Sequence, residues 1–307
     1  MAGHIPVLAR EAVQALNLPF DATLVDGTFG RGGHTSYCLN QLGSDARILG
    51  IDRDPDAISY ANENFADESR LQVVQGRFSE LQNLISENLP GALPNGILFD
   101  FGVSSPQLDI AERGFAFQTD GPLDMRMDPG QGVSAAEWLL HVSETELASV
   151  IWKLGEERFS RRIARAIKQH LLESEIQTTA VLAAIVSASI PKWEKHKHPA
   201  TRTFQAIRIF INQELEEIES VLPQALSALQ VGGRLVVISF HSLEDRLVKR
   251  FMKRHAKGDD FPPDLPITAD KLNPTIKLIG KAQRAGAEEL QSNPRARSAT
   301  LRVAEKL

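Results

Sequence analysis

Near its amino terminus the chain reads Thr23-Leu-Val-Asp26-Gly27-Thr-Phe-Gly30-Arg-Gly32-Gly33-His34. The apolar residues before Asp26 predict a buried strand, and the glycines after it predict a tight turn into a helix. Glycines at such a turn let the backbone approach a ligand, and the N–H groups at a helix start favour an anion. The stretch therefore predicts a ligand-binding loop at the carboxyl end of the first strand.

The first hundred residues alternate short apolar strands with helices. The expected strands are residues 23–25, 47–51, 71–74 and 96–101, and the expected helices are residues 7–16, 35–42, 55–65 and 79–89. Alternation at this spacing is typical of an α/β protein, with a doubly wound parallel sheet covered by helices on both faces. The loop after the first strand would then lie at the edge of that sheet where ligands bind.

After Asp100 the pattern changes, because residues 106–200 show no strand-like alternation. Residues 106–133 are rich in Gly, Pro and Asp and predict a loop. Helices are expected at residues 143–153, 156–172, 178–190, 203–222 and 242–255, and strands at residues 234–240 and 299–304. The simplest organisation is an α/β domain of residues 1–105 and 203–307, interrupted by an inserted, mainly helical domain of residues 106–202.

The composition is that of an ordinary globular protein, with 42% apolar and 24% charged residues. The longest apolar runs, residues 181–190 and 235–240, are shorter than the roughly 18 residues that a membrane span needs. We read no signal peptide at the amino terminus. A single cysteine, Cys38, excludes an internal disulfide and a cysteine-rich metal site. These features predict a soluble, cytoplasmic protein.

The net charge of −5 is unevenly distributed along the chain. Residues 151–210 carry +6 and residues 246–307 carry +7, so the remainder is strongly acidic. On a helical wheel Arg158, Arg161, Arg162, Arg165 and Lys168 share one face, opposite the apolar residues. Further cations in these two segments are Lys195, Lys197, Arg202, Arg295 and Arg297. They predict a surface that follows the phosphates of RNA or DNA, and the alternative is a set of solvated helix faces.

The position of Asp52 indicates the class of ligand. It ends the second strand, where a carboxylate can accept both ribose hydroxyls of an adenosine-containing cofactor. A dinucleotide site would have Gly-x-Gly-x-x-Gly, but Thr35 stands at the third glycine position. S-adenosylmethionine fits better, because Asp26 could hold its ammonium group and the backbone of Gly32, Gly33 and His34 its carboxylate. Methyl transfer is therefore favoured over hydride transfer by a nicotinamide cofactor.

Three further positions are candidates for the site. Phe78, after the third strand, could pack against adenine or belong to the core. Asp100 ends the fourth strand and could contact the donor, contact the acceptor or cap the next loop. His241 follows the fifth strand and points either into the cleft or at a backbone carbonyl, while Ser242 and Asp245 have the spacing of a helix start.

A metal site at His196-Lys-His198 is disfavoured. The two histidines have a spacing that could suit two ligands, but no third His or Cys lies nearby in the sequence. Lys192, Lys195 and Lys197 crowd the run, and their charge opposes cation binding. We therefore expect no metal.

Seven blocks of sequence resemble one known family, the bacterial 16S rRNA (cytosine-N4)-methyltransferases of the RsmH/MraW type. They run in order along nearly the whole chain and several are long and unusual. The blocks are Asp26-Gly-Thr-Phe-Gly-Arg-Gly-Gly-His34, Gly102-Val-Ser-Ser-Pro-Gln-Leu-Asp109, Glu112-Arg-Gly-Phe115, Gly121-Pro-Leu-Asp-Met-Arg-Met-Asp128, His198-Pro-Ala-Thr-Arg-Thr-Phe-Gln205, Ser239-Phe-His-Ser-Leu-Glu-Asp-Arg246 and Asn293-Pro-Arg-Ala-Arg-Ser298.

The resemblance implies a class I methyltransferase fold with an inserted substrate-recognition domain. It also implies that the acceptor is the N4 amine of a decoding-centre cytidine of the small ribosomal subunit. The residues implied to hold S-adenosylmethionine are Gly32, Gly33, His34, Asp52, Phe78, Asp100 and Gln107. Asp100 is the main candidate for contacting the amine, with Ser104 and His241 as weaker candidates. The tetrad Asp-Pro-Pro-Tyr of other amino-methyltransferases is absent after strand four, where Asp100-Phe-Gly-Val stands.

Other functions stay open at this point. The enzymatic alternatives are an NAD-dependent dehydrogenase and a methyltransferase that acts on another RNA or DNA base or on a small molecule. The binding alternative is a non-catalytic RNA-assembly factor with a methyltransferase fold. The sequence does not tell a monomer from a homodimer.

Overall fold

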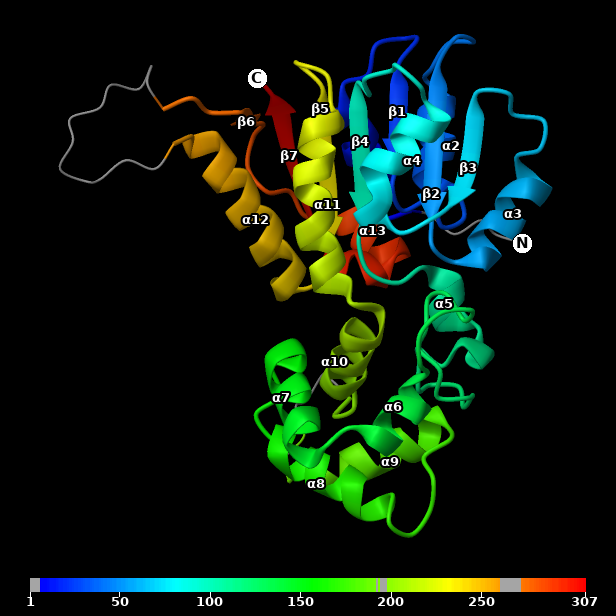
Figure 1. The fold of residues 1–307 in the computed structure, drawn as a ribbon, viewed down its shortest axis with the longest axis vertical. Coiled ribbons are helices and arrows are strands. Elements are labelled where there is room, and N and C mark those ends of the chain that lie inside the picture. Colours follow the sequence, from blue (N-terminus) through cyan, green and yellow to red (C-terminus); the bar gives the residue numbers. More distant parts are fainter. Residues whose placement is uncertain (1–5, 192, 194–197, 260–271) are drawn as a thin grey trace, which may run out of the picture. The chain divides into compact units, whose positions relative to one another are not determined.

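A seven-stranded sheet is the centre of the computed structural model, which describes residues 6–191, 193, 198–259 and 272–307 (Figure 1). The strand order is β3-β2-β1-β4-β5-β7-β6. The strands are β1 (Thr23–Asp26), β2 (Arg47–Asp52), β3 (Leu71–Gln75), β4 (Gly96–Asp100), β5 (Arg234–Ser239), β6 (Ile276–Leu278) and β7 (Thr300–Lys306). The first five strands are parallel, as predicted.

The last two strands differ from the expected parallel sheet. β7 pairs antiparallel with β5, and β6 pairs antiparallel with β7. β6 was not predicted at all, because it has three residues and only Ile276 is buried, which leaves no alternating pattern to detect. The sheet is thus a doubly wound α/β sheet with an antiparallel edge, and the predicted fold class is confirmed.

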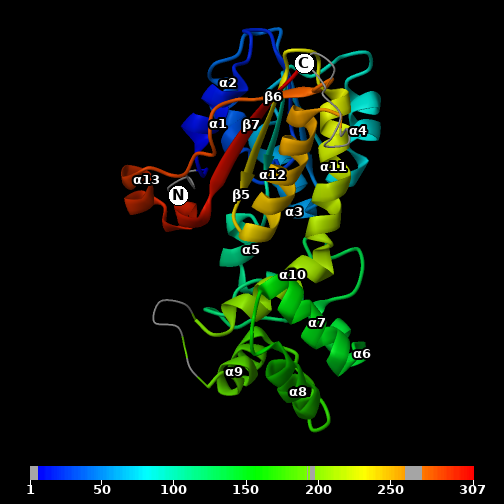
Figure 2. The ribbon, with the colours of Figure 1, turned by 90° about the vertical axis from the view of Figure 1, so that its left-hand side faces the viewer.

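Helices cover both faces of this sheet. They are α1 (Ala9–Leu16), α2 (Gly33–Leu39), α3 (Pro55–Asn64), α4 (Leu81–Asn88), α11 (Glu214–Ala228), α12 (Ser242–Lys257) and α13 (Ala287–Ser292), with short 3₁₀ turns η1 (Phe78–Glu80) and η4 (Pro294–Ser298). α4, α11 and α12 pack against one face, and α1 and α2 pack against the other. Figure 2 shows these two helix layers on opposite sides of the strands.

Successive residues of each strand supply the two cores. Ile97 and Phe99 of β4 enter the core under α4 and α11, whereas Leu98 between them enters the core under α1. Because side chains alternate across a strand, a central strand buried on both faces must be apolar throughout. This explains why the strands read as continuous apolar runs.

The chain forms two compact units, one of residues 1–102 and 215–307 and one of residues 103–214. The second unit is helical and has its own core, which includes Leu139, Ile151, Ile163, Val186 and Phe204. Its elements are α5 (Ser105–Asp109), η2 (Ala111–Arg113), α6 (Ala135–His141), α7 (Glu144–Gly155), α8 (Ser160–His170), α9 (Thr179–Ser189) and α10 (Thr201–Asn212). No helix in the described part of the chain is long and apolar enough to cross a membrane.

The predicted single helix 203–222 is wrong, because α10 ends at Asn212 and α11 begins at Glu214. Gln213 between them has a left-handed backbone with φ 53°. The Asn212 side chain accepts the Met127 N–H at 2.8 Å and donates to the Met125 carbonyl at 2.7 Å, which binds the end of α10 to the preceding loop. The apolar spacing continues through the break, so the sequence pattern did not reveal it.

The predicted helix 156–172 is also too long at its start. Glu156 has φ 52° and ends α7, and α8 begins at Ser160. The carboxylate of Glu157 accepts the Phe159 N–H at 2.8 Å in the turn between the two helices. The charged residues at this turn continue the helical composition, which hides the boundary.

Candidate active site

The carboxyl ends of β2, β1 and β4 bring three aspartates to one edge of the sheet. Asp52, Asp26 and Asp100 each end one of these neighbouring strands. The strand order reverses between β1 and β4, since the chain runs outward to β3 on one side and to β5 on the other. Open α/β sheets bind ligands at such a reversal point, so this edge of the first unit is the candidate active site.

The glycine loop between β1 and α2 is fixed by the second strand. Gly30, with φ 55°, donates its N–H to Asp52 Oδ2 at 2.7 Å, and the Phe29 N–H reaches the Ile51 carbonyl at 3.0 Å. Gly32 has φ 67° and lies against the Phe29 and Phe65 rings, which would be 2.8 and 2.7 Å from a Cβ placed there. The Gly32 N–H donates to the Phe29 carbonyl at 2.7 Å. Of the three backbone N–H groups predicted to hold a ligand carboxylate, Gly32 is thus occupied, and Gly33 and His34 at the start of α2 stay predicted contacts.

Asp26 organises this loop from inside. Its side chain is 1% exposed; Oδ1 accepts the Thr28 N–H at 3.2 Å and Oδ2 accepts the Thr35 hydroxyl at 2.7 Å. Burial raises the pKa of this carboxyl above its ordinary value, while His34 and the two hydrogen bonds act in the opposite direction. Thr35 is the residue that departs from the dinucleotide motif, and the structure shows that its hydroxyl holds the Asp26 carboxylate.

His34 and Asp100 face each other at the reversal point. His34 Nε2 lies 2.9 Å from the Val7 carbonyl oxygen, which can only accept, so this nitrogen carries a hydrogen. Its Nδ1 lies 3.7 Å from Asp100 Oδ2. The backbone N–H of Asp100 donates to the Thr28 hydroxyl at 2.7 Å, which joins the end of β4 to the glycine loop. The His34 ring is buried and thus held in one orientation beside the Asp100 carboxyl.

Asp100 has one unused acceptor atom. Its Oδ1 is buried and has no hydrogen-bond partner among the described residues. Burial raises the pKa of Asp100 to about 7; His34 opposes this shift, and the charges of Asp26 and Glu244 add to it. A buried polar atom without a partner is rare in folded proteins and often marks a functional position. Asp100 is therefore prepared to accept a hydrogen bond from a ligand.

The Asp52 carboxylate also accepts hydrogen bonds from the protein backbone. Its Oδ2 accepts the Gly30 N–H at 2.7 Å and its Oδ1 accepts the Asp54 N–H at 2.9 Å. Burial raises its pKa to about 6, although both hydrogen bonds lower it. Each carboxylate oxygen has two lone pairs, so Asp52 can position the glycine loop and still accept a ligand hydroxyl.

Phe78 fits both roles that its position in the sequence left open, a core residue and a contact for adenine. Its ring centroid lies 6.1 Å from that of Phe99 and 5.9 Å from that of Phe101, so it packs against the core. The side chain is nevertheless only half-buried. One face of the ring is thus held by the core while the rest is accessible to a planar ligand.

A residue that sequence reasoning missed holds the Phe78 segment. Glu217 of α11 is buried and accepts the backbone N–H and the hydroxyl of Ser79, both at 3.0 Å. Arg77 lies 3.5 Å from the same carboxylate, and Gln224 donates to the Ser79 carbonyl at 2.6 Å. The available signal was an acidic residue beside Ile218 on the apolar face of a predicted helix.

We expect Glu217→Ala to destabilise the protein by about 3 kcal/mol, because the Ser79 N–H and hydroxyl lose a charged partner. S-adenosylmethionine should also bind several-fold more weakly, since the Phe78 segment loses its support. Urea unfolding and calorimetric titration measure the two effects. Glu216→Ala, at an exposed neighbour on the same helix, is the matched control. Equal stability of the two variants would contradict the supporting role of Glu217.

His241 points at a carboxylate and not at a backbone carbonyl. It caps α12, with its Nδ1 accepting the Glu244 N–H at 3.4 Å and its Nε2 lying 3.1 Å from Glu244 Oε1. Glu244 is fully buried and accepts the N–H groups of Phe240 and His241 at 2.8 and 3.2 Å.

The cap of α12 therefore uses His241 and Glu244. The predicted Ser242–Asp245 cap is wrong, because the Asp245 carboxylate is bound by Arg302 at 2.7 and 3.0 Å.

Ser104 and Gln107 belong to the second unit, where they cap α5. Ser104 donates its N–H to Gln107 Oε1 at 2.9 Å, and the Gln107 N–H lies 3.5 Å from the Ser104 hydroxyl. Such a reciprocal pair satisfies backbone donors at a helix start. The structure thus gives both residues a local role, and their contacts with the acceptor and the donor stay predictions.

Several of the predicted RNA-binding arginines are exposed. Arg158 lies in the turn before α8, Arg161, Arg162 and Arg165 lie on α8, and Arg295 and Arg297 lie in η4. Arg165 lies 3.6 Å from Glu144, and Arg202 lies 3.7 Å from Glu157. Lys195 and Lys197 lie outside the described residues.

Lys168 departs from the predicted cationic face. Its amine donates to the Leu139 and Leu140 carbonyls at 2.9 and 3.2 Å, which satisfies the end of α6. Burial lowers its pKa. The α8 face therefore presents the four arginines without this lysine.

Comparison with known proteins connects this geometry to a family. The family model described as "MraW methylase family" matches residues 1–307. The chain belongs to the MraW methylase family. This membership confirms the predicted methyltransferase with S-adenosylmethionine as its cofactor, and the dehydrogenase alternative is wrong.

Two relatives are similar to this chain over nearly their whole length. The chain is 53% identical over 307 residues to "Ribosomal RNA small subunit methyltransferase H" of Nitrosococcus oceani, covering 100% of this chain and 98% of that protein. It is 51% identical to the protein of the same name from Hydrogenovibrio crunogenus, with coverage of 100% and 97%. Among solved structures, the rRNA-methylase from Clostridium thermocellum is 11% identical with a TM-score of 0.46, covering 99% of this chain and 100% of that one.

Proposed function

We propose that this methyltransferase transfers a methyl group from S-adenosylmethionine to the N4 amine of a decoding-centre cytidine in 16S rRNA. The observation that carries the proposal is the buried, unpartnered Oδ1 of Asp100 at the reversal point of the sheet. The names of its family relatives support ribosomal RNA of the small subunit as the substrate. The resemblance of the seven sequence blocks to the 16S rRNA (cytosine-N4)-methyltransferases supports cytosine N4 as the target.

The residues at the sheet edge fit the donor. The backbone of Gly33 and His34 would hold its carboxylate, Asp52 the ribose hydroxyls and Phe78 the adenine. Gln107 stays a predicted contact from the second unit. Asp26 stays a predicted partner of the ammonium group, and its two internal hydrogen bonds favour a role in shaping the loop. When bound, S-adenosylmethionine supplies a methyl group on a positively charged sulfur, which is an excellent leaving group.

Asp100 would then act on the acceptor amine. The N4 lone pair of cytosine is delocalised into the ring, so the amine is a weak nucleophile. A hydrogen bond from the amine to Asp100 Oδ1 orients it. As positive charge develops on the base, the carboxylate stabilises this charge and can take the proton. His34, whose Nε2 is held by the Val7 carbonyl, lies beside the other oxygen of this carboxyl, with its Nδ1 3.7 Å from Asp100 Oδ2.

The role of Asp100 as a proton acceptor predicts that the rate falls at low pH. The free protein has an Asp100 pKa of about 7, and only the ionised form accepts the amine hydrogen. We expect kcat/KM to fall about tenfold per pH unit below about pH 7, since kcat/KM reports the free enzyme. Initial rates between pH 5.5 and 8.5 measure this pH dependence of kcat/KM. A flat profile between pH 5.5 and 7 would contradict the assignment.

The substrate must reach the site as an unstacked base. Enzymes that modify a base take it out of the helix stack, because the target atom is not accessible there. The exposed arginines of α8 and η4 would hold the flanking phosphates. Action on the small ribosomal subunit agrees with the predicted bacterial cytoplasm, and a homodimer stays a prediction.

Transfer of radiolabelled methyl from S-adenosylmethionine to small subunits that lack this modification tests the proposal. The nucleosides are separated after digestion, and label in N4-methylcytidine is the expected result. Label in another nucleoside would keep the methyltransferase and reject the target. Donor binding without label on subunits, free RNA or DNA would point to a small-molecule acceptor. Absence of both donor binding and label would favour the non-catalytic assembly factor.

A further inference from the structure

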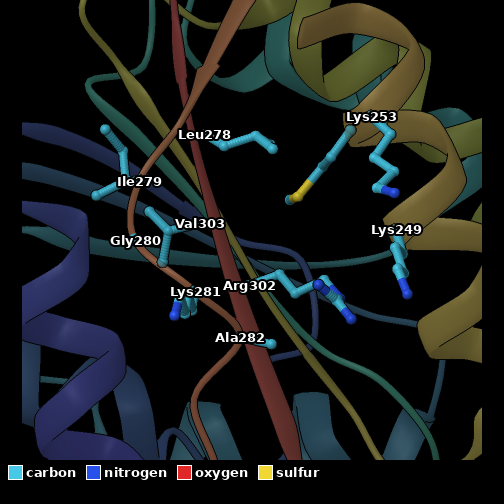
Figure 3. A pocket seen from close by; sticks show the side chains of 10 residues that line it. Lys249, Lys253, Leu278, Ile279, Gly280, Lys281, Ala282, Arg302 and Val303 are labelled. Carbon is cyan, nitrogen blue, oxygen red and sulfur yellow. The ribbon is translucent and has the colours of Figure 1, made fainter.

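A small pocket opens on the first unit among α12, the segment that follows β6, and β7. Its volume is about 80 Å³. α12 contributes Lys249, Met252 and Lys253, and β7 contributes Arg302 and Val303. The remaining wall is formed by residues 278–282 (Figure 3). No residue of the candidate active site lines this pocket.

The pocket has an excess of positive charge. Lys249, Lys253 and Lys281 are exposed, and none of them has an ion-pair partner in the described parts of the chain. Arg302 extends toward Lys249 (Figure 3), and its guanidinium is held by the Asp245 carboxylate at 2.7 and 3.0 Å. Asp245 is thus paired with Arg302, and the charges of Lys249 and Lys253 stay unpaired in the described parts of the chain. The pocket therefore has net positive charge that a bound anion would neutralise.

The positive charge continues along α12 beyond the pocket. Residues 246–257 contain six Lys or Arg and no Asp or Glu. Arg250 and Arg254 are exposed on the same helix, whereas Val248 and Met252 are buried against the sheet. A line of cations fits a ligand with repeated negative charges better than it fits a single small anion.

The floor of the pocket is apolar. Met252 is buried beneath it and Leu278 remains 43% exposed at the rim, while the Val303 side chain packs in the core on the other face of the sheet. An exposed leucine beside lysines suits a ligand that combines a phosphate with a flat apolar group. A nucleotide of a single-stranded RNA has this combination, and the pocket is too small to enclose a long apolar chain.

We propose that this pocket binds one nucleotide of the RNA substrate, with its phosphate at Lys249 and Lys253 and its sugar or base against Leu278. The inference rests on the proposed function, and it adds a contact on α12 that the sequence did not single out. α12 and η4 pack on opposite faces of the sheet, so the two elements would hold different parts of the RNA strand.

The test compares RNA binding of two charge-matched variants. Lys249→Gln/Lys253→Gln removes two charges from the pocket, and Arg10→Gln/Arg47→Gln removes two from exposed positions outside it. The probes are small subunits that lack the modification and a fluorescent single-stranded RNA. The slope of log Kd against log salt should fall by about 0.7 for the lysine variant, because the two lysines share one phosphate and each single-strand phosphate contact contributes about 0.7. At low salt its affinity should be about tenfold weaker.

A third variant separates charge from apolar contact. Leu278→Ser should weaken binding of the single-stranded RNA several-fold without changing the salt slope. Unchanged circular dichroism and unchanged affinity for S-adenosylmethionine in all variants show that the fold and donor site are intact.

Two results would overturn the inference. One is a lysine variant with the affinity and salt slope of the unsubstituted protein. The other is a lysine variant that binds free RNA normally and loses affinity only for whole subunits, which would assign the cations to an acidic protein. If the unsubstituted protein neither binds RNA nor methylates it, the proposed function itself fails, and the variants are not needed to show this.

Discussion

Asp100→Asn is expected to reduce kcat about a thousandfold, which is within the usual contribution of a positioned general base. The amide keeps the shape of the side chain but does not take a proton from the amine. Affinity for S-adenosylmethionine should change little compared with this loss. Single-turnover methylation of small subunits measures the rate, and calorimetric titration measures donor binding. Full methylation with normal donor affinity in Asp100→Ala would reject the assignment of Asp100.

Asp100→Asn should also stabilise the protein, and the gain in stability should be larger at higher pH. Because the folded-state pKa of Asp100 is raised from 3.8 to about 7, the folded state binds the proton more tightly than the unfolded state. Stability is therefore lost as the pH rises from about 4 to about 7. Asn has no such dependence, so the stability gained by the variant should increase by about 2–3 kcal/mol between pH 5 and pH 8.

Urea unfolding at both pH values measures this difference in stability. Asp45→Asn, at an exposed position, is the control and should show no such increase. A stabilisation of Asp100→Asn that is the same at pH 5 and pH 8 would mean that the buried carboxyl is not the cause.

Gly32→Ala is expected to have the second large effect. Its backbone has φ 67°, and the added Cβ would lie 2.7 and 2.8 Å from the Phe65 and Phe29 rings. The left-handed conformation alone costs an Ala side chain about 1 kcal/mol, and displacement of the rings moves the whole loop. Since a misplacement of about 1 Å can cost about a hundredfold in rate, we expect kcat/KM to fall about 100-fold and affinity for S-adenosylmethionine to fall with it.

Gly91→Ala separates the two causes. Gly91 has φ 73°, but a Cβ there would meet nothing within 4 Å. This control therefore carries the conformational cost without the ring contacts, and its donor affinity should stay unchanged. Calorimetric titration and urea unfolding of both variants give the comparison. Normal donor affinity in Gly32→Ala would show that the loop is not part of the donor site.

The sequence predicted the parallel part of the sheet because strands buried on both faces read as uninterrupted apolar runs. It also predicted that Asp26, Asp52 and Asp100 would end neighbouring strands, since each follows such a run directly. The antiparallel edge could not be predicted, because strand direction at β7 depends on how the chain returns to the sheet. β6 is too short to show a pattern.

Contacts between distant residues explain the other differences. Nothing near Glu217 in the sequence indicates that Ser79, more than a hundred residues away, supplies its hydrogen bonds. The pairing of Asp245 with Arg302 likewise removes the acid that the helix-start pattern would use. The internal hydrogen bonds of Asp26 were missed because the Thr35 hydroxyl becomes its partner only after α2 forms.

The separation of β4 from β5 in the chain affects how the protein reaches its native state. These neighbours pair from Gly96 with Arg234 to Asp100 with Ile238, and the entire second unit lies between them in sequence. Bringing together strands so far apart has a high loop-closure entropy and slows folding. If the second unit collapses early around its own core, the loop that remains to be closed becomes much shorter. Mutations in that core, such as at Ile163, would then delay sheet assembly even where they leave every strand untouched.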